Sequence, residues 1–327
     1  MIERALVLTA GLGTRLRPLT DVRAKAAIPV AGEPMIRRII RWLVARGTTD
    51  LVLNLHHRPE TITASVGDGS DLGARVRYSW EQPRVLGTAG GPRAALPLLA
   101  SAAGEPFLIV NGDTLTDIDL HEIDSAHRAA HALVTLALVP NREFMRYGGI
   151  LLDAGRRVVG FVPRGPGAQG SFHYVGVQVA HAEAFRELRA GAPANSIGGV
   201  YDAIVAAQPG AIRGFICDAE FRDVGTAADY WRTSFALAAR EGRCGSTAGR
   251  DAVIHPTARV TRSILWDDVE IGGGATIEDC IVTDRVIVPA GADYRRAILV
   301  RDTITGDVTA SAFDPEADLK HAQSADD

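Results

Sequence analysis

A glycine-rich turn follows directly after the first apolar run of the 327-residue chain and reads Gly11-Leu12-Gly13-Thr14-Arg15. Its glycines let backbone N–H groups approach a phosphate closely, its threonine adds a hydroxyl, and its arginine can bind two phosphate oxygens at once. The turn lacks the third glycine of the dinucleotide-binding fingerprint and the Gly-Lys-Ser/Thr ending of the P-loop. We interpret it as a phosphate-binding turn; the alternative is a turn with solvent-exposed arginines and no ligand.

Lysine is almost absent from this chain. Of its 35 basic residues only Lys25 and Lys320 are lysines, and Lys320 stands in a polar C-terminal segment. A compact ammonium group can enter a narrow phosphate site in which the wide, planar guanidinium would not fit. Lys25, which follows soon after Arg15, therefore indicates a second phosphate contact; the alternative is a chance surface lysine.

Two aspartates stand after candidate strands: Asp113 follows the apolar run at residues 107–110, and Asp223 follows the run at residues 216–221. Both are expected at strand ends, where the sites of open α/β sheets collect. A pair of carboxylates suits Mg²⁺, which takes few protein ligands and completes its shell with water and substrate phosphates. The alternatives are a hairpin turn at Asn111-Gly112 and an N-cap role for Asp223.

These residues need strands and helices to position them, and the first 235 residues alternate between the two. Strands are expected at residues 5–9, 51–55, 76–80, 107–110, 133–139 and 174–179, and helices at residues 34–45, 89–99 and 120–132. Strands that alternate with helices favour a mostly parallel sheet that is covered on both faces.

From residue 251 the chain repeats with a period of 17 residues, so that Ile254 superimposes on Ile271 and Ile264 on Ile281. Aliphatic residues about six apart suit short strands that stack coil upon coil, and about three coils fit into this segment. It resembles the left-handed hexapeptide-repeat β-helices. We do not assign His255 the catalytic role of a hexapeptide acyltransferase, because that role needs a longer β-helix.

Four segments are therefore expected. They are an α/β domain over residues 1–235, a linker over 236–250, a β-helix over 251–302, and a polar tail over 303–327 with a short strand at most and otherwise mobile.

The composition excludes several classes of partner and compartment. The net charge is only −4, which gives no reason to expect nucleic acid or an anionic membrane as partner. Three scattered cysteines form neither a disulfide framework nor a zinc motif and favour a reducing cytoplasm. No run of about 18 apolar residues occurs, so we expect neither a membrane span nor export.

The glycine-rich turn, extended to Thr20 and followed by Lys25 and an I-P-V-A-G-x-P segment, closely resembles the nucleoside-diphosphate-sugar pyrophosphorylases, which are sugar-1-phosphate nucleotidyltransferases. Further motifs of this family follow in order. They are the E-x-x-L-G-T-A-G-like Glu81 to Gly90, the N-G-D of Asn111-Gly112-Asp113, the Y-G segment Tyr147-Gly148-Gly149, the Y-x-G of Tyr174-Val175-Gly176 and the W/F-x-D-V-G-T-like Phe221 to Thr226. The whole pattern looks most like the mannose-1-phosphate guanylyltransferases.

The resemblance implies a fold and a set of site residues. The fold is α/β, with a Rossmann-like, mostly parallel mixed sheet as the nucleotidyltransferase domain, followed by a short left-handed β-helix. The implied residues are Arg15 and Lys25 as catalytic charges; Gly11, Gly13, Thr14, Glu81, Gly87 and Thr88 at the nucleotide; Asn111, Gly148, Arg164, Tyr174 and Gly176 at the sugar phosphate; and Asp113 and Asp223 at Mg²⁺. For Gly148, a β-turn without a ligand is the alternative.

One segment departs from the family pattern. The family's F-x-E-K-P reads Phe161-Val162-Pro163-Arg164-Gly165 here. Arg164 keeps the positive charge that the family lysine offers to the sugar phosphate, but the side chain of Pro163 cannot accept a hydrogen bond from a sugar hydroxyl. This departure leaves the sugar open and favours, as an alternative of another class, a non-catalytic nucleotide-sugar-binding regulatory protein.

The resemblance implies transfer of a nucleoside monophosphate from an NTP to a sugar 1-phosphate, with release of pyrophosphate. GTP and mannose 1-phosphate are the expected substrates, and glucose-1-phosphate uridylyl- or thymidylyltransferase activity is the alternative. The attacking phosphate is already an anion, so no general base is needed and Mg²⁺, Arg15 and Lys25 would neutralise charge. We also expect a homo-oligomer formed through the β-helix, whose open ends invite covering by another subunit.

Overall fold

The computed structural model describes residues 1–99, 104–302 and 304–317, which divide into two compact units. Unit 1 comprises Met1–Gly11 and Ile36–Arg222, and unit 2 comprises Leu12–Met35 and the described residues from Asp223 onward. The units do not follow the expected boundary at residue 235. Instead, the segment that contains Arg15 and Lys25 packs with the C-terminal part of the chain.

Unit 1 is built on a nine-stranded mixed sheet, in which β10-β9-β11-β6-β1-β4-β5 are successive neighbours, β8 lies beside β11, and β12 lies beside β8. Its strands are β1 (Arg4–Leu8), β4 (Asp50–Leu55), β5 (Arg75–Trp80), β6 (Phe107–Asn111), β8 (Val134–Pro140), β9 (Gly149–Leu152), β10 (Val158–Val162), β11 (Phe172–Ala180) and β12 (Ile212–Ile216). The apolar runs that predicted β1, β4, β5, β6, β8 and β11 are thereby confirmed.

Strand direction gives this sheet one functional edge. Strands β5, β4, β1 and β6 run parallel to one another, β11 runs antiparallel to β6, β8 is antiparallel to β11, and β12 is parallel to β8. The carboxyl ends of six strands therefore meet the amino end of β11 at one edge, which we call the carboxyl edge. Ligands of open α/β sheets bind outside this kind of edge.

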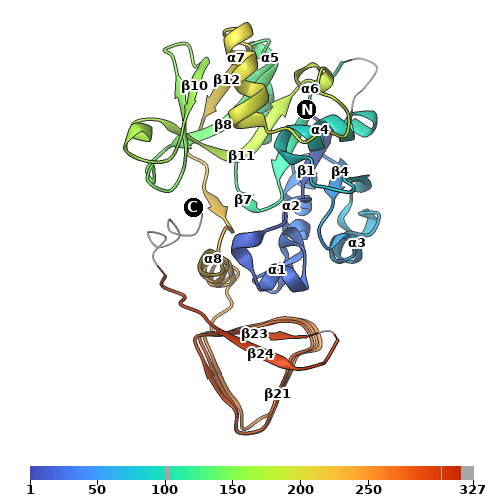
Figure 1. Cartoon of the computed structure of the whole chain (residues 1–327), viewed down its shortest axis with the longest axis vertical. Helices are drawn as coiled ribbons and strands as arrows, with labels where there is room; N and C mark the ends of the chain where they lie inside the picture. Colours follow the sequence, from blue (N-terminus) through green and yellow to red (C-terminus); the bar gives the residue numbers. More distant parts are fainter. Residues whose placement is uncertain (100–103, 303, 318–327) are drawn as a thin grey trace. The chain divides into compact units, whose positions relative to one another are not determined.

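Helices of unit 1 cover the sheet, and several of them close its main core (Figure 1). They are α2 (Met35–Val44), α3 (Pro59–Val66), α4 (Gly87–Leu99), α5 (Leu120–Ala129), α6 (Glu183–Arg186) and α7 (Tyr201–Ala207). Leu96 of α4, Phe185 of α6 and Tyr201 of α7 pack with Leu6 and Ile109 of the central strands. Burial of these side chains fixes the strands whose ends carry the site.

Unit 2 contains a parallel β-helix, whose coils are coloured orange to red in Figure 1 and are seen end-on as a triangle. Its three faces are β14-β17-β20-β23, β15-β18-β21 and β16-β19-β22. The strands are β14 (Thr247–Ala248), β15 (Val253–Ile254), β16 (Arg259–Thr261), β17 (Ile264–Leu265), β18 (Glu270–Ile271), β19 (Thr276–Glu278), β20 (Ile281–Val282), β21 (Ile287–Val288), β22 (Asp293–Arg295) and β23 (Ala297–Arg301).

The 17-residue repeat is confirmed in register, because Ile254 pairs with Ile271 and Ile264 pairs with Ile281. Ile271, Ile277 and Val282 point into the apolar interior of the coils. A further strand, β24 (Val308–Ala312), pairs antiparallel with β23 and forms the short strand expected in the polar tail. The mobile part expected beyond it lies mainly outside the described residues.

The remaining elements of unit 2 belong to the loop and the connection. They are α1 (Leu19–Val22), β2 (Pro29–Val30), β3 (Glu33–Pro34) and α8 (Ala227–Arg240), together with the 3-10 turns at Thr14–Leu16 and Lys25–Ala27. The expected linker over 236–250 is partly structured, because α8 continues to Arg240 and β14 already belongs to the first coil. No helix among the described ranges is long and apolar enough to cross a membrane.

Candidate active site

The site residues of unit 1 lie along the carboxyl edge in two groups. Glu81 follows β5 and Gly11 lies three residues beyond the end of β1, so both stand at the end of this edge where the sequence predicts the nucleotide, which we call the nucleotide end. Asn111 ends β6 and Tyr174 lies near the start of β11, so both stand where the sequence predicts the sugar phosphate, which we call the sugar end. The structure thus places these four predicted residues at one edge of the sheet, and their ligands stay a prediction.

At the nucleotide end, Glu81 shapes its own turn. Its carboxylate is fully buried; Oε2 accepts a hydrogen bond from the Leu86 N–H (2.6 Å) and Oε1 accepts one from Asn54 Nδ2 (2.7 Å). A buried carboxylate is stable only when such donors meet its oxygens. Both oxygens therefore have partners within the protein, and direct contact of Glu81 with a nucleotide stays a prediction.

Gly87 and Thr88 fasten the same turn to a neighbouring segment. Gly87 has a φ of +76°, and a Cβ there would lie 2.7 Å from the Ala194 carbonyl oxygen, so only glycine fits. The Thr88 hydroxyl oxygen accepts hydrogen bonds from the N–H and the hydroxyl of Ser196, at 2.9 and 3.0 Å. These two residues hold the start of α4 in place.

At the sugar end, a bulge in β11 brings Asn111 and Gly176 together. The pairing of β11 with β8 shifts between Tyr174 and Gln178, and Gly176 within this bulge has a φ of +81°. A Cβ on Gly176 would lie 3.0 Å from both Asn111 Cβ and Thr114 Oγ1. The Y-x-G motif is therefore the bulge that lets β11 cross closely over the turn after β6.

Tyr174 brings an unsatisfied hydroxyl to this turn. Burial raises the pKa of Tyr174 well above its usual range, and Tyr201 and the nearby Asp113 carboxylate raise it further, so the phenol stays neutral. Its buried hydroxyl has no hydrogen-bond partner within the described part of the chain. A buried hydroxyl in this state needs a bound partner, for which a sugar hydroxyl, a phosphate or a water is chemically suited.

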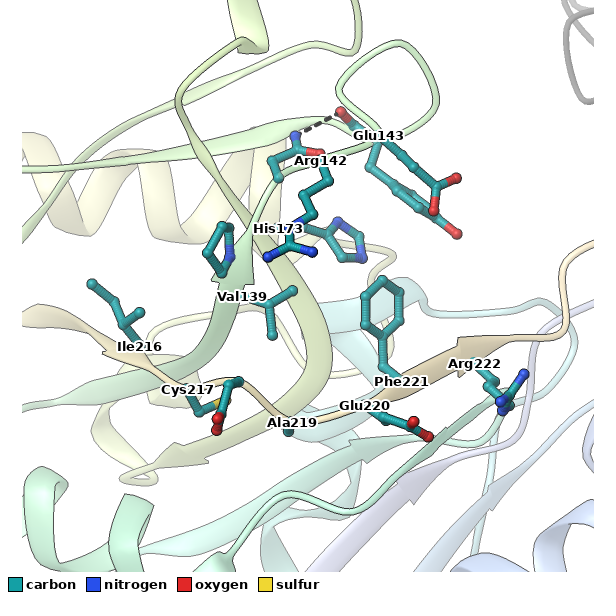
Figure 2. A pocket seen from close by; sticks show the side chains of 14 residues that line it. Val139, Arg142, Glu143, His173, Ile216, Cys217, Ala219, Glu220, Phe221 and Arg222 are labelled. Atoms are coloured by element: carbon teal, nitrogen blue, oxygen red, sulfur yellow. Dashed lines mark hydrogen bonds between the residues drawn. The ribbon is translucent and has the colours of Figure 1, made fainter. Parts of the chain in front are cut away.

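A pocket of about 750 Å³ opens at the ends of β8, β11 and β12 (Figure 2). It is lined by Val139, Pro140, Asn141, Arg142, Glu143, Tyr147, His173, Ile216, Cys217, Asp218, Ala219, Glu220, Phe221 and Arg222. The ring of His173 lies 4.1 Å from that of Tyr147 and 4.9 Å from that of Phe221, between centroids. The volume lies within the range of small-molecule sites.

His173 enters this pocket as a neutral ring. Burial, together with the positive charge of Arg146, lowers its pKa to about 4. At neutral pH the imidazole therefore offers one donor and one acceptor nitrogen, together with an aromatic face. Neither His173 nor Asn141 was predicted, because each stands outside the recognised motifs.

Gly148 and Arg164 are also brought together. A Cβ on Gly148 would lie 3.1 Å from the Val162 carbonyl oxygen and 3.8 Å from the backbone nitrogen of Arg164. Asn141 Nδ2 donates to the Gly148 carbonyl at 3.4 Å. Pro163 and Arg164 are both exposed, in the turn after β10. The departure from the family pattern thus lies at an exposed turn.

Unit 2 gathers the residues of the glycine-rich turn with Asp223. Gly13 has a φ of +61°, and a Cβ there would lie 3.3 Å from Lys25 Cβ, so Lys25 packs across this turn. A Cβ on Gly225 would lie 3.2 Å from Asp223 Oδ2 and 3.5 Å from Arg15 Nη1. Arg15 and Asp223 therefore stand beside the same glycine.

The two alternatives for the aspartates are now decided. The N-cap of α8 is Thr226, whose hydroxyl accepts from the Asp229 N–H (3.1 Å) in a capping box, and not Asp223. The turn at Asn111-Gly112 does not form a hairpin within the sheet, because β7 (Thr114–Thr116) is not one of its nine strands. Asp113 and Asp223 belong to different units, and their pairing stays a prediction.

Two family models match the chain. Residues 4–240 match the model described as "Nucleotidyl transferase", and residues 235–327 match the model described as "GlmU-like, C-terminal hexapeptide". The chain belongs to the nucleotidyl transferase family. The junction of the two matches falls in α8, which agrees with the repeat that follows this helix.

Relatives of this nucleotidyl transferase include several sugar-phosphate enzymes. The chain is 30% identical over 305 residues to a mannose-1-phosphate guanylyltransferase of Mycobacterium tuberculosis, which covers 89% of this chain and 83% of the relative. It is 47% identical over 116 residues to the N-acetylmuramate alpha-1-phosphate uridylyltransferase of Neisseria meningitidis, covering 36% and 49%. The crystal structure of HddC from Yersinia pseudotuberculosis shares the fold, with a TM-score of 0.62 at 20% identity, covering 72% of this chain and all of that one.

Proposed function

We propose that this protein transfers a nucleoside monophosphate from an NTP to a sugar 1-phosphate, with GTP and mannose 1-phosphate as the favoured pair. The observation that carries the proposal is the convergence of Asn111, Asp113, Tyr174 and Gly176 at the end of β6. The guanylyltransferase relative, which matches most of the chain, supports this choice of base and sugar.

In the proposed reaction, an oxygen of the sugar 1-phosphate attacks the α-phosphorus of the NTP. A phosphorus–oxygen bond forms to the sugar phosphate, and the bond to the β-phosphate oxygen breaks, so that pyrophosphate leaves. The nucleophile is already anionic, so the protein has to position the reactants and neutralise negative charge. We assign this neutralisation to Arg15 and Lys25, and the phosphate contacts to backbone N–H groups of Gly11, Gly13 and Thr14.

The residues present fit Mg²⁺. Asp113 and Asp223 carry carboxylate oxygens, which are the hard donors that Mg²⁺ takes. Within the described ranges no cluster of three or more His, Cys, Asp and Glu side chains is arranged to hold a metal. We propose that Asp113 and Asp223 hold Mg²⁺; when bound, the ion would neutralise charge on the substrate phosphates.

The sugar is proposed to occupy the pocket beside Tyr147, His173 and Phe221. Aromatic faces can cover the apolar side of a sugar ring, while the pocket's polar groups can meet its hydroxyls. A uridylyltransferase with a modified sugar is the second candidate, because the relative with 47% identity is a uridylyltransferase for N-acetylmuramate 1-phosphate.

The test is pyrophosphate release from a matrix of GTP, UTP, dTTP and ATP with mannose, glucose and N-acetylmuramate 1-phosphates, with Mg²⁺ or EDTA. We expect GTP with mannose 1-phosphate to react fastest, and EDTA to abolish turnover. Asp113→Asn should lower kcat at least 100-fold while circular dichroism stays unchanged. No turnover with any pair, but measurable nucleotide binding, would support the regulatory alternative instead.

We further propose a cytoplasmic homo-oligomer. All three cysteines are free thiols, as a reducing compartment would leave them. Val253 (61% exposed) and Ile287 (49% exposed) lie on one face of the β-helix, where they present apolar surface to solvent. Covering such surface is the usual gain when subunits associate.

A further inference from the structure

Three neighbouring parallel strands, β1, β4 and β5, end side by side at the nucleotide end of the carboxyl edge. Each strand places a polar group there. Thr9 and Ala10 follow β1 and lead into the glycine-rich turn, Asn54 is the second-last residue of β4, and Glu81 follows β5. Asn54 is 3% exposed and Glu81 is fully buried, so their polar atoms depend on one another.

The hydrogen bonds among these groups form a directed chain. The N–H groups of Thr9 and Ala10 donate to Asn54 Oδ1, at 2.6 and 3.3 Å. Asn54 Nδ2 donates to Glu81 Oε1 at 2.7 Å, and Glu81 Oε2 accepts from the Leu86 N–H at 2.6 Å. These hydrogen bonds fix the orientation of the Asn54 amide, because only its oxygen can face two N–H donors and only its nitrogen can face a carboxylate.

We propose that Asn54 is a positioning residue that couples the two nucleotide-binding segments, the glycine-rich turn and the Leu86–Thr88 turn. The proposal rests on the proposed function for the identity of the ligand. Nothing in the recognised motifs assigns Asn54 a role. It acts through the backbone of Ala10 on one side and through Glu81 on the other, and it does not itself contact the NTP.

Close packing leaves the hydrogen-bonded side chains of Asn54 and Glu81 little room to rearrange. A Cβ on Gly91, in the second turn of α4, would lie 2.5 Å from Glu81 Oε1 and 2.9 Å from Asn54 Nδ2. The helix backbone therefore closes over the carboxylate–amide contact. A buried carboxylate that loses its donor under such a cover has no water to replace it, so the turns themselves have to move.

The test exchanges donor and acceptor. Asn54→Asp alone places two carboxylates at the 2.7 Å contact, and Glu81→Gln alone leaves one oxygen for two donors. In the double variant, the carboxylate introduced at position 54 accepts from the Thr9 and Ala10 N–H groups and from the amide nitrogen introduced at position 81. The amide oxygen at position 81 then accepts from the Leu86 N–H. Each of these hydrogen bonds is thereby restored, and only the contact between positions 54 and 81 has its donor and acceptor exchanged.

We expect KM for the NTP to rise at least tenfold in Asn54→Asp and about fivefold in Glu81→Gln, with KM for the sugar 1-phosphate within twofold of wild type. The double variant should return to within threefold of wild type. Dissociation constants for the NTP alone, from calorimetry, should follow the same order. Should Asn54→Asp not fold, Glu81→Gln and the double variant still make the comparison, because Glu81→Gln keeps the side-chain volume.

Asp124→Asn is the matched control, since it changes a carboxylate of similar burial (3% exposed) that binds Arg128 on α5. It should lower the melting temperature and leave KM for the NTP unchanged. Unaltered NTP affinity in both single variants would overturn the coupling. So would a double variant whose loss of NTP binding free energy equals the sum of the losses in the two single variants. Wild-type turnover, measured first, reports on the proposed function alone.

Discussion

Lys25 packs across Gly13 with its Cβ, in the loop that also carries Arg15. If its ammonium enters a narrow phosphate site, arginine cannot replace it despite the equal charge, because the guanidinium is wider and planar. We predict that Lys25→Arg lowers kcat at least tenfold with little change in melting temperature. Arg17→Lys, an exchange in the same loop at an exposed residue paired with Asp21, should leave kcat within twofold. Equal kcat in Lys25→Arg and wild type would contradict the assignment.

For single residues, the sequence motifs predicted where in the fold a residue lies better than which groups its side chain contacts. Gly13 was predicted from the glycine-rich turn, and Gly87 and Gly176 from the family motifs; the structure adds the physical reason, because only glycine fits their positive φ and close packing. Whether Thr88 faces a ligand or the backbone of residue 196 depends on a segment over 100 residues away, and no local pattern contains that information. Asn54 left a weak signal, a lone amide in the apolar run 51–55, since a buried amide requires partners.

Among the elements of unit 2, the loop around Lys25 is bound to the β-helix. Arg23 donates twice to Asp284 (2.6 and 2.7 Å) and once to Asp267 (2.9 Å), and its guanidinium lies 5.3 Å from the centroid of the Trp266 ring. The two aspartates are equivalent positions of successive coils. The repeat therefore supplies a rigid pair of carboxylates that fixes the loop two residues before Lys25.

Helix α8 holds the other side of that loop. Trp266 Nε1 donates to the Tyr230 hydroxyl (2.9 Å), which in turn donates to the Pro29 carbonyl (2.8 Å). All three groups are buried, so each hydrogen bond replaces one that water cannot offer there. The β-helix thus acts on residues 23–29 through both a charged and an uncharged contact.

We predict that Arg23→Leu lowers the free energy of unfolding by about 3 kcal/mol, because it leaves the partly buried Asp284 carboxylate without its guanidinium and removes one of the two arginines that bind Asp267. It should also lower kcat through the displaced loop. Arg250→Leu is the control, since Arg250 binds the same Asp267 from an 85% exposed position, against 12% for Arg23, and should cost less than about 1 kcal/mol. Urea denaturation and steady-state kinetics of both variants give the comparison, and equal losses would refute the role of burial.

His127 of helix α5 makes the free energy of unfolding depend on pH. Its ring stacks on that of His181, with 5.1 Å between the ring centroids. Burial, together with the neighbouring His181, lowers the pKa of His127 to about 4. Because the unfolded chain takes up this proton near pH 6.5 and the folded protein only near pH 4, stability present above pH 6.5 is lost as the pH falls. We predict a loss of about 3 kcal/mol between pH 7 and pH 4 from this group.

His127→Gln should reduce this pH dependence, whatever its effect at pH 7. The measurement is the free energy of unfolding by urea at pH 7, 6, 5 and 4 for both proteins. His173 has a similarly lowered pKa and should keep its own contribution in the variant. Identical slopes in variant and wild type would exclude His127 as a source.

For the whole molecule, the sequence predicted both architectures but not how the chain is distributed between units. The apolar runs of β4 and β6 and the 17-residue repeat are local patterns, and each was confirmed. Residues 12–35 pack with the C-terminal part of the chain through contacts such as Arg23 with Asp284, which are 261 positions apart. No periodicity links two such segments, so only the structure reveals that they form one unit.

Two exposed aliphatic side chains on one face of the β-helix, Val253 and Ile287, predict self-association. Val253, Glu270 and Ile287 are stacked at equivalent positions of successive coils. Light scattering should give a dimer or larger assembly for the wild type. Val253→Asp with Ile287→Asp, which extends the charge of Glu270 over the face, should shift it to a monomer. A monomeric wild type at micromolar concentration would contradict the prediction.

The division of unit 2 into two distant stretches sets an order of events during synthesis. At roughly 5–20 residues per second, the ribosome needs roughly 13–50 s to pass from Arg23 to Asp284. During that time residues 12–35 have been made, but the tryptophan and the two carboxylates that hold them have not. The surroundings of Lys25 are completed late, although Lys25 is among the first residues made, because the contacts that hold its loop form only after the coil that carries Asp284 has emerged.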